Sequence, residues 1–90
     1  MAVFIVVPTL PKAEIKPGLK AAINESQLPH YQLTNGETLI AFKGTSKELS
    51  DLLKISDGTN GPAIVAAISS YFGRAPTDIW EWVSANWDQA

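Results

Sequence analysis

The sequence predicts an α+β fold with a four-stranded antiparallel sheet and an extra C-terminal helix. Three observations predict it. The hydrophobic patterns alternate between strand-like and helix-like in a definite order, an Asn35-Gly36 pair separates two strand-like runs, and residues 45–48 carry a helix-start signal. Along the chain the elements are strand, helix, strand, strand, helix, strand and helix.

The first strand and helix come from the N-terminal third. The run Ala2–Val7 is apolar at every position and rich in β-branched residues, which is typical of a central strand covered on both faces. Pro8 and Pro11 end it and favour a loop. Apolar residues at helical spacing predict a helix from Pro17 to Glu25, because proline is tolerated in a first helical turn. A preceding turn at 12–16 is possible.

A hairpin follows. The strand-like segments His30–Thr34 and Glu37–Lys43 flank Asn35-Gly36, and this dipeptide favours a two-residue type I′ turn since both residues tolerate positive φ. The second segment has apolar residues on both faces, Leu39 and Ala41 on one and Ile40 and Phe42 on the other. It is therefore predicted to be a central strand.

The second helix begins with Thr45-Ser46-Lys47-Glu48, a capping box, and continues with an apolar stripe of Leu49, Leu52 and Leu53. A turn cluster at 57–61 follows. The strand-like run Ala63–Phe72 comes next, and its first six residues have the composition of a buried strand. Gly73 breaks it. The last helix begins near Pro76-Thr77-Asp78, where proline and an acidic residue suit a helix start.

This βαββαβ order is the ferredoxin-like (split βαβ) pattern. It predicts the spatial order 4-1-3-2 for the four strands, with two helices on one face. The terminal helix then covers a sheet edge, the open face or a partner subunit. Because the open face carries apolar residues of both Ala2–Val7 and Ile64–Ile68, we expect it to be an association site.

Composition excludes several classes of protein. Ninety residues make one domain, 1–90, and 46% apolar with 18% charged residues are globular values. A net charge of −2 argues against a general phosphate-binding surface. The absence of cysteine excludes disulfides, thiolate catalysis and cysteine metal sites. Ala2–Val7 is too short to span a bilayer and has no basic residue before it, so we expect a cytoplasmic protein.

Three tryptophans, Trp80, Trp82 and Trp87, fall on one broad arc of the terminal helix. They are either one face of the core, or, where the arc is wider than the sheet can cover, part of an interface with a second subunit. A ligand-stacking role is a third possibility. Arg74, after Gly73, is available to a carboxylate across an interface or to a surface salt bridge.

Other candidate sites are weaker. Lys12, Lys16 and Lys20 lie four residues apart and are either a nucleic-acid contact or a solvated face. His30, the single histidine, has no nucleophile or orienting partner nearby in sequence and is expected at the surface. Glu48 and Asp51 share a helix face, but Glu48 is assigned to a cap. We expect no catalytic residue, no metal site and no cofactor.

The opening Met1–Val7 strand, the helix and hairpin after it, and the apolar strand followed by Ile79-Trp80-Glu81-Trp82-Val83 resemble small bacterial ferredoxin-like proteins. These are related to the CRISPR adaptation nuclease superfamily and include the SinR-like group. The resemblance implies a homodimer. The nucleases of that superfamily carry an aspartate at the end of the first strand, where this chain has Pro8-Thr9, which argues against nuclease activity.

These observations lead to three hypotheses. The first is a non-enzymatic interaction or regulatory module, homodimeric, with an unknown protein partner and with Trp80, Trp82, Trp87 and Arg74 at the interface. The alternative is a nucleic-acid-binding or nucleic-acid-processing protein that uses Lys12, Lys16 and Lys20. A third, small-ligand sensing at a dimer seam, rests on analogy with the fold. No membrane association is expected.

Overall fold

The computed structural model describes residues 2–34, 36–70 and 72–87. The elements are β1 (Ala2–Pro8), a short 3-10 helix η1 (Lys12–Glu14), α1 (Pro17–Ser26), β2 (His30–Gln32), β3 (Thr38–Phe42), α2 (Ser46–Leu52), β4 (Ala63–Ile68) and α3 (Thr77–Asn86). All four strands pair antiparallel in one sheet, in the order β2-β3-β1-β4. This confirms the predicted α+β class and strand order, an arrangement compatible with a ferredoxin-like fold.

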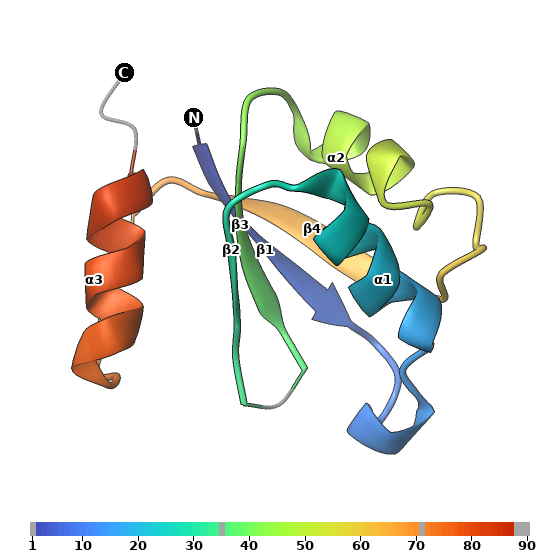
Figure 1. The fold of residues 1–90 in the computed structure, drawn as a ribbon, viewed down its shortest axis with the longest axis horizontal. Coiled ribbons are helices and arrows are strands. Elements are labelled where there is room, and N and C mark those ends of the chain that lie inside the picture. Colours follow the sequence, from blue (N-terminus) through green and yellow to red (C-terminus); the bar gives the residue numbers. More distant parts are fainter. Residues whose placement is uncertain (1, 35, 71, 88–90) are drawn as a thin grey trace.

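The sheet separates two helical layers, with α1 and α2 on one face and α3 on the other (Figure 1). Phe4 and Val6 of the central strand β1 point towards α1 and α2, where a contiguous core forms with helix and loop residues. Every member of this core is less than a tenth exposed; the others are Leu19, Ile23, Ile40, Leu49, Leu53 and Ile55. None of the helices in these ranges combines the length and hydropathy that crossing a bilayer requires.

The second face is covered by α3 of the same chain. Val3 of β1, Leu39 of β3 and Val83 of α3 form its buried centre. Partly buried residues surround them: Ile5, Tyr31, Leu33, Ile68, Ile79, Trp82 and Trp87. Of the three positions that the sequence left open for the terminal helix, the structure selects the open face of its own sheet.

The prediction that Ala63–Ile68 is a buried strand was wrong. β4 is an edge strand, and none of its six residues is buried. Ile64 is 58% exposed. The predicted strand order already placed this strand at an edge; its burial was wrongly inferred from its apolar composition, which does not distinguish a covered strand from an exposed one. The strand also ends at Ile68, four residues before the expected end, and Phe72 is fully exposed.

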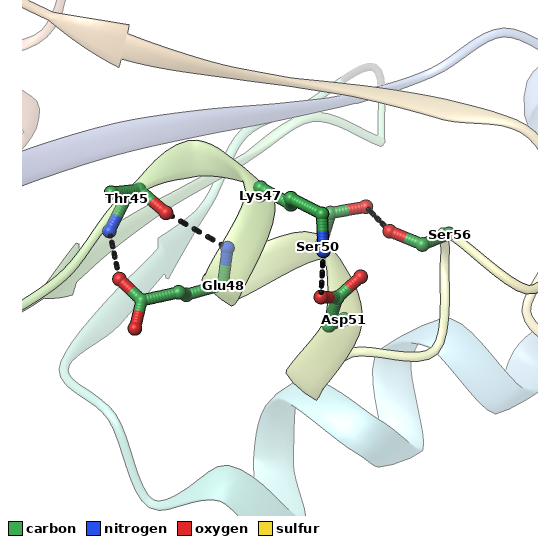
Figure 2. Close-up of polar contacts among 6 residues, drawn as sticks. All are labelled: Thr45, Lys47, Glu48, Ser50, Asp51 and Ser56. Atoms are coloured by element: carbon green, nitrogen blue, oxygen red, sulfur yellow. Dashed lines mark hydrogen bonds and ion pairs between the residues drawn. The ribbon is translucent and has the colours of Figure 1, made fainter.

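Figure 2 shows that α2 is held by local polar contacts. The Thr45 hydroxyl accepts the amide of Glu48 at 3.1 Å, and the Glu48 carboxylate accepts the amide of Thr45 at 2.8 Å, which confirms the capping box. Leu49 and Leu53 are fully buried. Leu52 is 50% exposed, so its assignment to the apolar stripe was wrong; α2 ends there, and its buried side follows the four-residue spacing from Leu49.

The first helix follows the sequence closely, whereas the hairpin loop is one residue longer than predicted: Gln32 pairs with Thr38, which leaves residues 34–36 between Leu33 and Glu37. α1 starts with Pro17 in its first turn and ends one residue beyond the predicted Glu25. In the hairpin, the amide of Leu33 donates to the carbonyl of Glu37 at 2.7 Å, and Gly36 has φ +101°. The predicted type I′ turn also involves Asn35, which lies outside the described residues.

The loop between α2 and β4 is fixed by one buried side chain. Asn60 is 8% exposed, and its Nδ2 donates to the carbonyl of Leu53 at 2.6 Å. Its backbone amide donates to the carbonyl of Lys54 at 3.0 Å. A Cβ added to Gly18 of α1 would lie 2.5 Å from Asn60 Oδ1. Asn60 therefore ties this loop to α2 while packing against the start of α1.

Candidate functional site

A cavity of about 180 Å³ lies between α1 and the β2–β3 hairpin, and is called here the α1 pocket. Its apolar wall is formed by Ile15, Leu19 and Ile23, and Leu19 and Ile23 are themselves buried in the core. Apart from Pro17 and Gly36, the remaining lining residues are polar or basic, and no carboxylate from the described residues lines it. They are Lys16, Lys20, Asn24, His30, Gln32 and Thr38.

The strand residues of the α1 pocket share a face because of the sheet register. His30 pairs with Ile40, and Gln32 pairs with Thr38, so all four side chains point towards α1 and α2. His30 is half-buried, and its Nδ1 lies 2.9 Å from the carbonyl of Leu28, which requires a proton on that nitrogen. The other ring nitrogen has no partner among the described residues.

One end of the α1 pocket is closed by a close approach between the segment before α1 and the hairpin. A Cβ added to Gly36 would lie 2.7 Å from Ile15 Cδ1, and the backbone of Gly36 has positive φ. Both constraints favour glycine. Lys16 also lines the pocket, and its aliphatic chain lies near Gly61, since a Cβ there would lie 3.3 Å from Lys16 Cδ.

A second polar contact fastens α3 to the sheet. The Tyr31 hydroxyl of β2 donates to Asp78 Oδ2 in the first turn of α3, and the rings of Tyr31 and Trp82 lie 6.4 Å apart at a tilt of 55°. The hydrogen bond to Asp78, followed by burial and the charge of the carboxylate, raises the pKa of Tyr31. A raised pKa means that the folded state holds the phenol proton more tightly than the unfolded chain does.

We therefore expect Asp78→Asn to lower the pKa of Tyr31 towards its ordinary value, because the acceptor charge is lost. The stabilising effect of this contact is present below the ordinary tyrosine pKa and disappears as the pH rises through the raised one. The pKa of Tyr31 is measured from tyrosinate absorbance as the pH is raised, in a Tyr71→Phe background where Tyr31 is the one remaining tyrosine. Glu81→Gln on the same helix should leave the midpoint of this titration unchanged. An unchanged midpoint in Asp78→Asn would contradict the assignment.

The predicted interface residues do not form one cluster. Trp82 and Trp87 are half-buried against the sheet of their own chain, and Trp80 is half-buried on the same helix. Arg74 is exposed in the segment between β4 and α3. The interface role of these four residues stays a prediction, and the two tryptophans on the sheet also serve as core.

The predicted nucleic-acid lysines are divided between two elements. Lys12 starts η1, whereas Lys16 precedes α1 and Lys20 lies within it. Lys16 and Lys20 are exposed, and both line the α1 pocket. Their role in nucleic-acid contact stays a prediction.

The candidate acidic pair is engaged in helix contacts. Glu48 completes the capping box, and Asp51 accepts the ammonium of Lys47 at 2.9 Å. The turn at 57–61 closes on itself, with the Asp57 carboxylate accepting the amide of Thr59 at 2.9 Å. Over the described ranges, no group of three or more His, Asp or Glu side chains is placed to hold a metal ion.

Sequence reasoning missed the α1 pocket. It identified Lys16 and Lys20 by their spacing and treated His30 as an isolated surface residue. A signal was present. In a strand that begins at His30, alternation puts Tyr31 and Leu33 on one face, which places His30 and Gln32 together on the other face. The buried position of Thr38 on the neighbouring strand depends on register, which alternation alone does not provide.

Comparison with family models, curated proteins and solved structures finds no match to this chain. The resemblance to the CRISPR adaptation nuclease superfamily and its SinR-like group therefore stays a prediction.

Proposed function

We propose that this protein is a non-enzymatic interaction or regulatory module that forms a homodimer, and that the edge strand β4 is its dimer interface. The observation that carries the proposal is the composition of this edge. Ala63–Ile68 contains no charged residue, none of its residues is buried, and its outer side has no partner strand among the described residues. An exposed, apolar edge strand is a template for pairing with another chain.

The opposite edge of the sheet provides a useful contrast. β2 has three residues, and His30 and Gln32 place polar side chains along it. Short, polar edges resist pairing, whereas β4 has twice the length and lacks both lysine and proline. Ile64, Phe72 and the nearby Ile5 and Val7 add exposed or half-exposed apolar surface next to β4. An intermolecular contact would bury this surface.

A second copy fits this edge because the charges are compatible. No charged residue occurs between Asp57 and Arg74. In an antiparallel pairing about a two-fold axis, the Arg74 end of one β4 segment faces the Asp57 end of the other, so opposite charges approach each other. The result is an isologous interface, the commonest kind in homodimers. It also gives Arg74 the carboxylate partner that its sequence position suggested.

The test is the mass of the protein in solution. We expect sedimentation velocity to show a dimer within the range of about 1 to 100 µM. This range brackets the dissociation constant of a dimer of micromolar affinity. Ile64→Lys places a charge on the paired edge and should weaken dimerisation about tenfold or more. Leu52→Lys is the matched control, since Leu52 is similarly exposed but lies on α2, and it should leave the mass unchanged.

A wild-type monomer throughout this concentration range would refute the dimer. A dimer that Ile64→Lys leaves intact would refute the assignment of β4 as its interface and would point to the α3 surface, including Trp80. Circular dichroism of both variants checks that each remains folded.

A further inference from the structure

We propose that the α1 pocket binds a small organic carboxylate with a short, branched apolar body. The pocket is at the β2 side of the sheet, whereas the proposed dimer interface is at β4. This inference therefore does not rest on the proposed function. Three features of the pocket support it: its unbalanced positive charge, a threonine hydroxyl and a glutamine amide in the lining, and an apolar wall.

The charge comes from Lys16 and Lys20. They are four residues apart, with Lys16 at the N-cap of α1 and Lys20 within it, and the ion pair found among the described residues, Lys47–Asp51, involves neither. Like charges at this spacing destabilise a helix slightly. Because the lining also lacks a carboxylate, the two ammonium groups share a site with no compensating negative charge from the protein. A bound anion would supply that charge.

Thr38 provides the second feature. It is 5% exposed and lines the pocket from β3. No buried side-chain oxygen or nitrogen among the described residues lacks a hydrogen-bond partner, so the Thr38 hydroxyl, which makes no side-chain hydrogen bond there, is not enclosed and is accessible to a ligand in the pocket. Gln32, its partner in the sheet register, lies beside it in the lining. A carboxylate can accept from the hydroxyl, from the Gln32 amide and from a lysine.

The apolar wall determines the chemistry of the part of the ligand that lies beyond its carboxylate. Ile15, Leu19 and Ile23 form it, so the site also has a surface for aliphatic carbon. A volume of about 180 Å³ is slightly above that of an engineered cavity of about 150 Å³ that holds benzene. The ligand then has about six to eight non-hydrogen atoms. A cation is disfavoured by the lysines, and a bare inorganic anion would leave the apolar wall unused.

The experiment is an NMR titration of the ¹⁵N-labelled protein with isovalerate. Its neutral isostere isovaleramide and inorganic phosphate are titrated in parallel, each to about 20 mM, because ligands of this size bind in the millimolar range. We expect saturable shifts of the backbone amide signals of Lys20, Gln32 and Thr38 with isovalerate. Isovaleramide and phosphate should each bind about tenfold more weakly.

Variants separate this site from general charge effects. Lys16→Gln with Lys20→Gln should raise the Kd for isovalerate about tenfold, whereas the matched pair Lys43→Gln with Lys54→Gln, outside the pocket, should leave it unchanged. Thr38→Val should weaken binding about threefold, because it removes a hydroxyl that lines the pocket.

Several outcomes would overturn the proposal. If isovaleramide binds as tightly as isovalerate, the ligand need not be an anion; if phosphate does, the ligand needs no apolar body. If isovalerate causes no saturable shift, or shifts only signals of β4 and α3, then the α1 pocket is not the binding site. A gel-mobility shift of a short RNA that requires Lys16 and Lys20 and is insensitive to isovalerate would assign the lysines to nucleic acid instead.

Discussion

Phe4→Ala is expected to lower the free energy of unfolding by about 3–5 kcal/mol. Phe4 is 1% exposed at the centre of β1, flanked in the sheet by Ile40 and Ala67. Its ring meets Phe42 edge-on at 6.0 Å. Truncation loses both the transfer free energy of the ring and the contacts around the space it leaves. For 90 residues, 0.05–0.15 kcal/mol per residue gives a total of about 5–13 kcal/mol, so the loss is a large fraction.

The matched control is the same substitution at Phe72, which is fully exposed. Phe72→Ala should change the free energy of unfolding by less than about 0.5 kcal/mol. Urea unfolding followed by tryptophan fluorescence measures both variants. Both are made in the Ile64→Lys background so that dimer dissociation does not contribute. A cost for Phe4→Ala below that of Phe72→Ala would mean that the sheet does not have the register described above.

Asn60→Ala is expected to cost about 1–3 kcal/mol, the penalty for leaving a buried polar group unpaired. The substitution removes the donor to the Leu53 carbonyl, at the point where the α2–β4 loop packs on α1. Asn24→Ala, at an exposed position on α1, is the control and should be close to neutral. Thermal unfolding measures both, since 1 kcal/mol shifts the midpoint by about 4–8 °C in a domain of this size.

A double-mutant cycle with Gly18→Ala tests the mechanism. Helix propensity alone predicts that alanine at Gly18 stabilises by about 1 kcal/mol. A Cβ there would lie 2.5 Å from Asn60 Oδ1, however, and Asn60 is held in place by its bond to Leu53. Gly18→Ala should therefore destabilise the wild type and stabilise Asn60→Ala. Additive effects would show that the two residues do not interact.

Local signals in the sequence were sufficient for most elements. The capping box at Thr45 and Glu48 is a chemical pattern that needs no tertiary information, and it formed as predicted. Pro17 marked the start of α1 in the same way. The strand order followed from the element order, because the βαββαβ pattern has few topologies.

Burial was harder to predict where it depends on neighbours in space. The run Ala63–Ile68 has a composition as apolar as that of β1, but β1 lies between two strands and β4 has one. Pairing, not composition, decides which of the two is enclosed. Leu52 shows the same limit, since its exposure follows from the end of α2, which hydrophobic spacing alone did not locate.

The candidate site was only partly predictable for the same reason. Lys16 and Lys20 were recognised as a stripe along one helix, which is a local property. The residues opposite them come from β2 and β3, and the sheet register that places Gln32 beside Thr38 is a long-range property. The charge of the site could thus be anticipated, whereas the strand residues that line it could not.

The position of α3 has a consequence for biosynthesis. All four strands precede α3 in the chain, so the sheet and its α1–α2 layer are complete in sequence before the residues that cover the second face (Figure 1). While the chain is being synthesised, there is therefore an interval in which Val3 and Leu39 remain exposed to solvent. During that interval the nascent chain presents an exposed apolar surface to which chaperones can bind, until α3 folds and Val83 covers it.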